Sequence, residues 1–211
     1  MRLPVAGVAV LFCACTLGTG SAANPALDSA TAKSVVLQAG DLAAVQKCPQ
    51  SDRWADLMLK GEPEMLPTGF AAWSDLEAAG ATDGWLSLFA AREAECPLLL
   101  GFTPPASPLV YSAVITFKDS SSAAANFDSV SRSFPVGAEF AARYAAAGGT
   151  LTRGASTGIG DNSVVAEISL RGVPTYVAYW QRKNFDAVIY ADNLSGADAA
   201  TAINRMNGRI H

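Results

Sequence analysis

The chain has 211 residues, of which 50% are apolar and 16% are charged, and its net charge is −4. This composition excludes an intrinsically disordered protein, because such chains are poor in apolar residues and rich in charge. The negative net charge and the scattered basic residues also exclude a general electrostatic attraction for nucleic acid or anionic lipid.

The N-terminus has the pattern of an export signal. Arg2 precedes an apolar run at 5–17, and small residues follow it up to Ala23. This order matches a secretory signal with a cleavage site at Ser21-Ala22-Ala23 better than it matches a buried N-terminal helix. The apolar run is also shorter than the ~20 residues that a membrane-spanning helix needs. We therefore expect a signal at 1–23, a linker at 24–33 and a single domain at 34–211 outside the cytoplasm.

A lipoprotein signal is the alternative to simple secretion. The residues Leu11-Phe12-Cys13-Ala14-Cys15 resemble a bacterial lipobox, although Phe12 and Cys13 depart from its usual pattern. A diacylated Cys15 would hold the domain on the outer face of the membrane without spanning it. Both secretion and lipidation of Cys15 stay open at this point.

Two cysteines remain after the signal, Cys48 and Cys96. An exported chain meets an oxidising environment, so we expect a disulfide between them, which would stabilise the fold by about 3–4 kcal/mol in the chain-entropy model. A metal or redox pair is the alternative. It is disfavoured because the chain has no CxxC motif and no histidine near either cysteine.

The first half of the chain predicts short helices. We expect one within 34–42, where Gly40 breaks the helix and a tight turn follows, one from Ser51 or Asp52 to about 58, and one at 68–79 before Gly80. The apolar run at 85–91 is too short to assign as helix or strand. The segment 97–108 contains four prolines, which predicts an extended connection and not a central strand.

The second half is organised by two units of strand, polar turn and Ala-rich helix. The first has a strand at 111–117 and a helix at 122–134, and the second has a strand at 185–191 and a helix at 197–210. A further helix at 138–147 lies between the units. Strands at 163–170 and 173–182 are expected to form an antiparallel meander with the strand at 185–191 through the turns Arg171-Gly172 and Lys183-Asn184.

Both Ala-rich helices carry an apolar stripe at helical spacing. The predicted buried residues are Ala123, Phe127, Val130 and Phe134 in the first helix, and Ala199, Ile203, Met206 and Ile210 in the second. Ser195 is the predicted N-cap of the second helix, with Asp198 three residues later. The order of elements predicts an α+β fold, with an antiparallel sheet of about four to six strands and Ala-rich helices packed on it.

Motifs for catalysis are weak. Gly154-Ala155-Ser156-Thr157-Gly158 matches the G-x-S-x-G nucleophile elbow, and Asp192 and His211 would complete a triad formally. A nucleophile elbow, however, follows a buried apolar strand and precedes a helix, and neither context is predicted here. We expect this segment to be a loop.

Paired carboxylates could also act in a hydrolase, and three pairs lie close in the sequence: Glu62/Glu64, Glu93/Glu95 and Asp192/Asp198. Nothing in the sequence brings any pair to one cleft. Because the one histidine, His211, is the last residue, we expect no metal site and no cofactor. A secreted hydrolase using Ser156 or a carboxylate pair remains the alternative function.

Aromatic residues offer the stronger binding hypothesis. The strand at 173–182 is apolar or aromatic on both faces, so both faces are expected to be covered, or one is covered and the other lined by a ligand. Tyr176 and Trp180 share one face, and they are our candidate ligand-binding residues. The alternative is that both belong to the hydrophobic core.

The order of features resembles small exported bacterial lipoproteins and the extracellular sensor domains of bacterial receptor Ser/Thr kinases. The features are the N-terminal export signal, the segment Leu37-Gln38-Ala39-Gly40-Asp41-Leu42, the first strand–helix unit, and the segment Gly160-Asp161-Asn162-Ser163 before the meander. The resemblance implies an α+β sandwich with a disulfide and a role in extracytoplasmic binding or sensing. It carries no catalytic residues.

These observations lead to an expected function. We expect an exported, non-enzymatic binding or sensor-type domain, anchored by lipid if Cys15 is modified, whose partner is a small ligand or a cell-envelope component. A structural envelope protein without a pocket is a further alternative.

Overall fold

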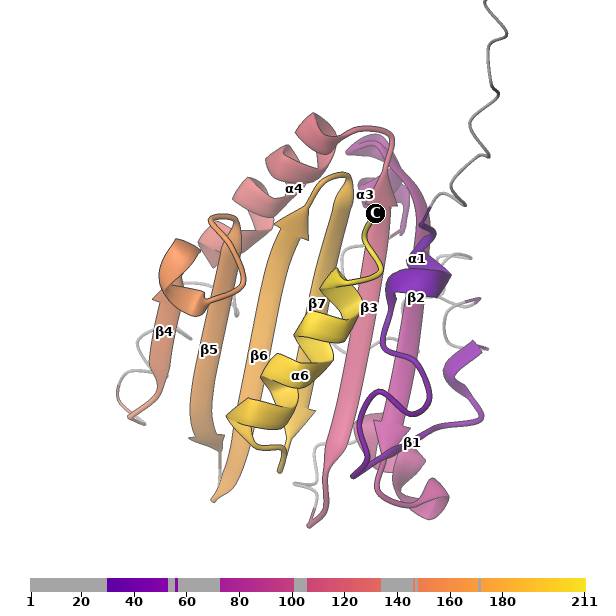
Figure 1. Cartoon of the computed structure of the whole chain (residues 1–211), viewed down its shortest axis with the longest axis vertical. Helices are drawn as coiled ribbons and strands as arrows, with labels where there is room; N and C mark the ends of the chain where they lie inside the picture. Colours follow the sequence, from indigo (N-terminus) through magenta and orange to yellow (C-terminus); the bar gives the residue numbers. More distant parts are fainter. Residues whose placement is uncertain are drawn as a thin grey trace, which may run out of the picture.

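The computed structural model describes residues 30–52, 56, 73–100, 106–133, 146, 148–170 and 172–211. They form one antiparallel sheet of seven strands in the order β1-β2-β3-β7-β6-β5-β4, with helices on it (Figure 1). The helices are α1 (Ala32–Val35), α3 (Trp73–Ala78), the 3-10 helix η2 (Glu93–Leu100), α4 (Ser120–Ser133), the 3-10 helix η3 (Gly154–Thr157) and α6 (Gly196–Asn207). The strands are β1 (Gln46–Lys47), β2 (Ala81–Ala90), β3 (Leu109–Phe117), β4 (Thr150–Arg153), β5 (Ser163–Leu170), β6 (Val173–Arg182) and β7 (Phe185–Asp192).

The predicted α+β class is confirmed, and the sheet is slightly larger than expected. The predicted meander is present as β5, β6 and β7. Lys183 and Asn184 form the two-residue turn between β6 and β7, and Lys183 has a φ of 54°, as such turns require. The strands that the sequence did not indicate are the short edge strands β1 and β4, which are too brief to leave a periodic pattern in the sequence.

The run at 85–91, which the sequence left unassigned, belongs to β2 as far as Ala90, where the strand ends. Trp85 pairs with Val114 and Ala90 with Leu109, so the partner strand β3 decides the conformation. The predicted extended connection at 97–108 is wrong for 97–100, which belong to η2. This compact turn is held by the local bond of Glu95 to Arg92, by the bond of Glu95 to Ser107 and by the disulfide from Cys96 to Cys48, of which the disulfide joins residues 48 positions apart.

The predicted helix at 34–42 is also wrong in its extent. Helix α1 ends at Val35 after one turn, which Thr31 and Ser34 close with a capping box. Val35, Val36 and Leu37 are all 0% exposed. A longer helix would turn one of three consecutive residues toward solvent, whereas an irregular segment can bury all three. We call residues 30–42 the strap.

The helix predicted near 51–58 lies mostly outside the described residues. Ser51, a predicted cap, is fully buried, and its hydroxyl accepts from Leu88 N and donates to Leu88 O. Ser51 therefore ties this segment to β2. The helix at 68–79 is described from Trp73 to Ala78, and Gly80 follows it with a φ of 99°. The helix expected at 138–147 lies outside the described residues except for residue 146.

The stripe predicted for α6 is confirmed, since Ala199, Ile203, Met206 and Ile210 are all buried and Ser195 accepts a bond from Asp198 N as the N-cap. The stripe of α4 differs from the prediction. Ala123, Phe127 and Ser131 are buried, whereas Val130 is 36% exposed and Phe134 lies outside the described residues. The buried line of α4 therefore follows i, i+4, i+8.

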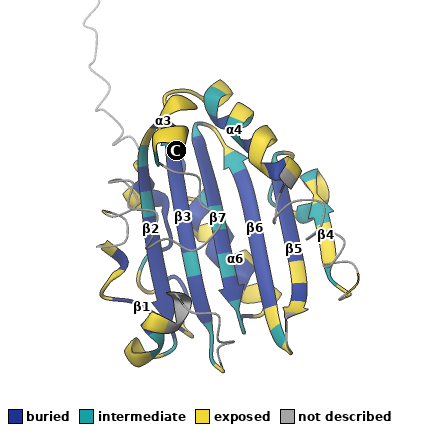
Figure 2. Ribbon diagram, turned by 180° about the vertical axis from the view of Figure 1, so that it is seen from behind, coloured by how far each residue is buried: buried dark blue, intermediate teal, exposed yellow. Residues whose placement is uncertain are grey.

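The sheet is covered on two faces. The front face, seen in Figure 1, carries α6 and the strap, which share one apolar core with Trp180, Val110 and Val114. The back face, seen in Figure 2, carries α4 near one end of the strands and η2 near the other. The central strands β3, β7 and β6 are buried along most of their length on both faces (Figure 2).

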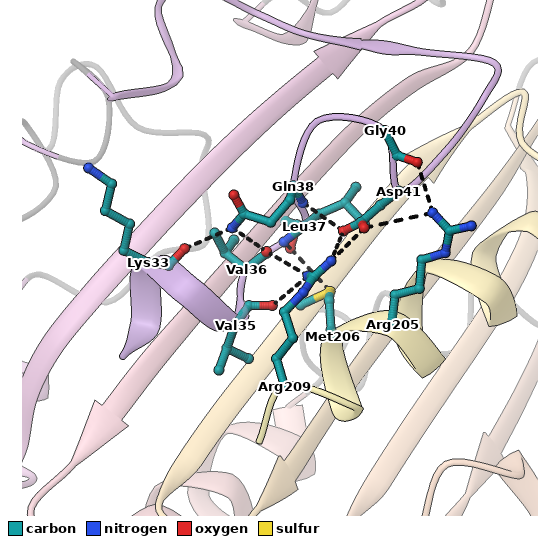
Figure 3. A network of polar contacts seen from close by, with 11 residues as sticks. Lys33, Val35, Val36, Leu37, Gln38, Gly40, Asp41, Arg205, Met206 and Arg209 are labelled. Carbon is teal, nitrogen blue, oxygen red and sulfur yellow. Dashed lines mark hydrogen bonds and ion pairs between the residues drawn. The ribbon is translucent and has the colours of Figure 1, made fainter. Parts of the chain in front are cut away.

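Hydrogen bonds from two arginines hold the strap against α6 (Figure 3). Arg209 donates to the carbonyls of Val35 and Val36 and to the Asp41 carboxylate, at 2.6 Å from Nη2 to Oδ2. Arg205 donates to Gly40 O at 2.8 Å. Asp41 is 8% exposed and also accepts from Gln38 N. The described strands do not pair with these carbonyls of the strap, so Arg205 in α6 and Arg209 just after it provide the bonds that a ladder would otherwise supply.

Substituting Arg209 tests this network. Arg209→Ala leaves the buried Asp41 carboxylate without its hydrogen-bonded cation and removes a donor from the carbonyls of Val35 and Val36, so we expect a loss of about 2–4 kcal/mol in the free energy of unfolding. Arg205→Ala is the matched control. Its side chain is 49% exposed and lies 3.8 Å from Asp41, so we expect a loss below about 1 kcal/mol. Equal losses in urea denaturation would contradict the role given to Arg209.

Candidate functional site

A hollow of about 310 Å³ lies where β5 ends, β6 begins and α6 starts. In Figure 1 these elements meet at the lower end of the sheet. Its lining includes apolar side chains and hydroxyl groups and one carboxylate: Thr150, Glu167, Ile168, Ser169, Pro174, Thr175, Tyr176 and Leu194, with Gly148 and Gly196. The hollow forms because α6 covers the centre of the front face, while β5 and β4 extend beyond the helix (Figure 1).

Tyr176, one of the two predicted binding residues, lines this hollow. It pairs with Glu167 across β5 and β6, which places both side chains on the front face. Burial, together with the negative charge of Glu167, raises the pKa of Tyr176 to about 12. The phenol is therefore protonated at neutral pH and can donate a hydrogen bond, while the exposed Glu167 carboxylate can accept one.

Trp180, the other predicted binding residue, lies elsewhere. It is 1% exposed and belongs to the core under α6, where its Nε1 donates to Asn207 Oδ1 at 2.9 Å. Tyr176 and Trp180 are four residues apart on one strand, a spacing of about 13 Å. The structure thus gives Trp180 the contacts of a core residue, and its predicted contact with a ligand is untested.

The back face holds a polar group that the sequence did not indicate. Asp192 was expected in a turn, yet it ends β7 and accepts from Thr175 Oγ1 at 2.6 Å. Burial raises the pKa of Asp192 and raises that of its neighbour Tyr190 to about 12. The Tyr190 ring is stacked on Tyr111, with 6.2 Å between centroids. Alternation in β7 is the one signal that could have placed Tyr190 and Asp192 on the same face.

The formal triad is not assembled. Ser156 is exposed in η3, a 3-10 turn between the edge strand β4 and β5. No hydrogen bond joins Ser156 to His211 in the part of the chain that the structure describes, and the carboxylate of Asp192 is bonded to Thr175. The segment is therefore a turn, as expected. The strand before it, β4, is an exposed edge strand, and the strand β5 follows it, so it lacks the buried strand and the helix that flank a nucleophile elbow.

The carboxylate pairs are not brought to one cleft either, as far as the structure describes them. Glu95 bonds to Arg92 and Ser107, and Asp198 bonds to Ser195 at the start of α6. Glu62 and Glu64 lie outside the described residues, as does Cys15. Among the residues described, no group of three or more His, Cys, Asp or Glu side chains could hold a metal ion.

The disulfide is the structural finding that bears on where the chain works. Cys48 and Cys96 form the expected disulfide, with 5.8 Å between Cα atoms. Within the described ranges, no helix has both the length and the apolar composition needed to cross a membrane.

Comparison with known proteins gives little further information. No family model matches the chain, and no curated protein matches it. Among solved structures, the extracellular domain of PknH from Mycobacterium tuberculosis is similar, with 12% identity and a TM-score of 0.42 over 83% of this chain and 81% of that chain. The proposals below rest on this chain's own residues.

The core role of Trp180 can be tested by Trp180→Phe. This change removes the bond to Asn207 Oδ1 and leaves a small cavity under α6, so we expect the free energy of unfolding to fall by about 1–3 kcal/mol. Urea denaturation measures the change. A loss below about 0.5 kcal/mol would show that Trp180 does not support the core.

Proposed function

We propose that this chain is an exported, non-enzymatic binding or sensor-type domain whose partner is a small ligand or a cell-envelope component. The hollow beside Tyr176 is the observation that carries the proposal. It combines apolar walls at Pro174 and Leu194 with a phenol donor and a carboxylate acceptor, a mixture common in ligand sites. Tyr176 is thus the residue for which the predicted binding role has a geometric basis.

The disulfide supports a location outside the cytoplasm. Cysteines stay reduced in most cytosolic proteins, whereas exported domains form disulfides readily. Cys48 is 1% exposed and Cys96 is 4% exposed, so the bond is enclosed by protein. It fastens the segment that follows the strap to η2 beside β2 and β3.

The strap and the hollow lie at opposite ends of α6. Arg209, just beyond the C-terminus of α6, bonds to the strap, while Gly196, its first residue, borders the hollow. Twelve helical residues separate these ends, a length of about 18 Å. A lipid anchor on Cys15, joined to the domain through the strap, would thus leave the hollow open for a partner.

Blocking the hollow tests the binding proposal. We expect the protein purified from its native host to carry a small molecule that native mass spectrometry detects as an added mass. Ser169→Trp places a large side chain in the hollow and should abolish the added mass, because Ser169 lines it and is exposed. Ser129→Trp, at an exposed position of α4, is the matched control and should retain it. No added mass on the wild type, or the same mass on both variants, would contradict a ligand in this hollow.

Mass spectrometry of the mature N-terminus tests the anchor. We expect a chain that begins at Cys15 and carries a diacylglyceryl group, and we expect Cys15→Ala to release the protein from the membrane fraction, because two acyl chains are enough for stable anchoring. An unmodified chain beginning near Ala23 would show secretion without an anchor.

A further inference from the structure

A buried carboxylate joins α4 to the back face of the sheet. Asp186 lies on β7 and is 2% exposed. Its Oδ2 accepts from Asn126 Nδ2 of α4 at 2.7 Å and from the Tyr179 hydroxyl of β6 at 2.9 Å. Asn126 Nδ2 also lies 3.3 Å from the Tyr179 hydroxyl, so a closed triangle of polar contacts links α4, β6 and β7.

The second oxygen of this carboxylate has no hydrogen-bond partner among the described residues. Asp186 Oδ1 is buried without a hydrogen bond. A buried ionised carboxylate needs donors on both oxygens or a cation, and leaving one oxygen unsatisfied makes the charged form costly. The neutral acid avoids most of this cost and keeps both bonds to Oδ2. The geometry therefore favours the protonated form while α4 is in place.

Among the described residues of the neighbouring elements, no charged group compensates a charge on Asp186. Tyr179 on β6 is the titratable group that faces Asp186, and burial also raises the pKa of its hydroxyl. On β3 the residue opposite Asp186 is Ile115. The other charged residues around this end of α4 and β6 are exposed and contribute no shift to Asp186: Lys118, Asp119, Asp128, Arg132, Arg153, Arg182 and Lys183. Burial accordingly raises the pKa of Asp186 from 3.8 to about 7.

We propose that Asp186 is a proton-operated clasp, which holds α4 closed on the sheet when protonated and loosens α4 when it ionises. The remaining contacts of α4 in the described structure suit a helix that can loosen. They are chiefly the ring of Phe127 stacked on Tyr179 at 5.1 Å, the small buried Ala123, and Ser131, whose carbonyl accepts from Arg153. This inference concerns the other face of the sheet and does not depend on a ligand in the hollow.

The direction of the pH response follows from linkage. When an acid has a higher pKa in the closed state than in the open state, its protonated form stabilises the closed state. This stabilisation is complete when the pH lies below the pKa of the open state. That stabilisation is lost as pH rises from about 4 to about 7, the window set by the shift from 3.8 to about 7. Acidification therefore tightens α4. Each unit of difference between the closed-state and open-state pKa of Asp186 changes the opening equilibrium constant of α4 tenfold. Because water that reaches the carboxyl group reduces this difference, we expect the opening equilibrium constant to change by about 10- to 100-fold.

Hydrogen exchange of the full mature protein tests the clasp. After correction for intrinsic rates, the opening equilibrium of α4 amides should rise at least about tenfold from pH 5 to pH 8, while amides of β3 serve as the internal reference. Asp186→Asn, a mimic of the neutral acid, should remove the pH dependence. Asp192→Asn is the matched control, because it changes a carboxylate on the same strand and face that is bonded to Thr175 and not to α4.

The result can overturn the proposal in two ways. A wild-type α4 whose opening does not change with pH, or a change that persists in Asp186→Asn, would exclude the clasp. If Asp186→Asn does not fold, Tyr179→Phe gives an independent measurement, because it keeps the ring and removes one donor to the ionised carboxylate. Carboxyl NMR titration should then show the midpoint of Asp186 moving upward from its wild-type value near neutral pH, and a wild-type midpoint below about 5 would exclude the clasp.

Discussion

Burial of the central strands on both faces is the constraint on which this structure depends. Ala178 and Trp180 of β6 face the front, Val177 and Tyr179 face the back, and all four are buried. A strand of this kind must be covered twice, so one layer of helices cannot complete the fold. Helix α6 and the strap cover the front, whereas α4 and η2 pack on the back (Figures 1 and 2).

The two covers differ in chemistry. The front is apolar at its centre, and its polar bonds lie at the margin, where Arg205 and Arg209 hold the strap (Figure 3). The back places carboxylates among apolar residues, at Asp186 and Asp192. Apolar contacts hold the front equally well at any pH. In contrast, the packing of the back cover depends on the protonation of its carboxyl groups, because an ionised carboxylate is more costly to bury than the neutral acid.

The hollow is a geometric consequence of how α6 crosses the sheet. The helix begins at Gly196, beside the first residues of β6, and covers the middle strands, so the ends of β5 and β6 lie beyond its edge. The result is a site whose walls come from strands and a helix start, with Tyr176 positioned by the ladder between β5 and β6.

The local sequence pattern was enough to predict some features of this protein, whereas others depend on tertiary contacts. The meander, its turn at Lys183, the buried stripe of α6 and the cap at Ser195 follow from periodicity and turn chemistry, which act over a few residues, so the sequence alone predicts them. The disulfide could be predicted because only two cysteines, Cys48 and Cys96, follow Cys15 in the sequence. Tyr176 could be named as a candidate from its strand, but nothing local separated it from Trp180, whose burial depends on where α6 lies.

Tertiary structure alone decided the rest. Residues 85–90 became a strand because β3 pairs with them, and the strap is irregular after the single turn of α1 because Val35, Val36 and Leu37 are all buried between other elements. The triangle of Asn126, Tyr179 and Asp186 joins residues as many as 60 positions apart. The physical reason is that desolvation and hydrogen bonding of a buried group depend on which elements close over it, and a single sequence does not display that packing.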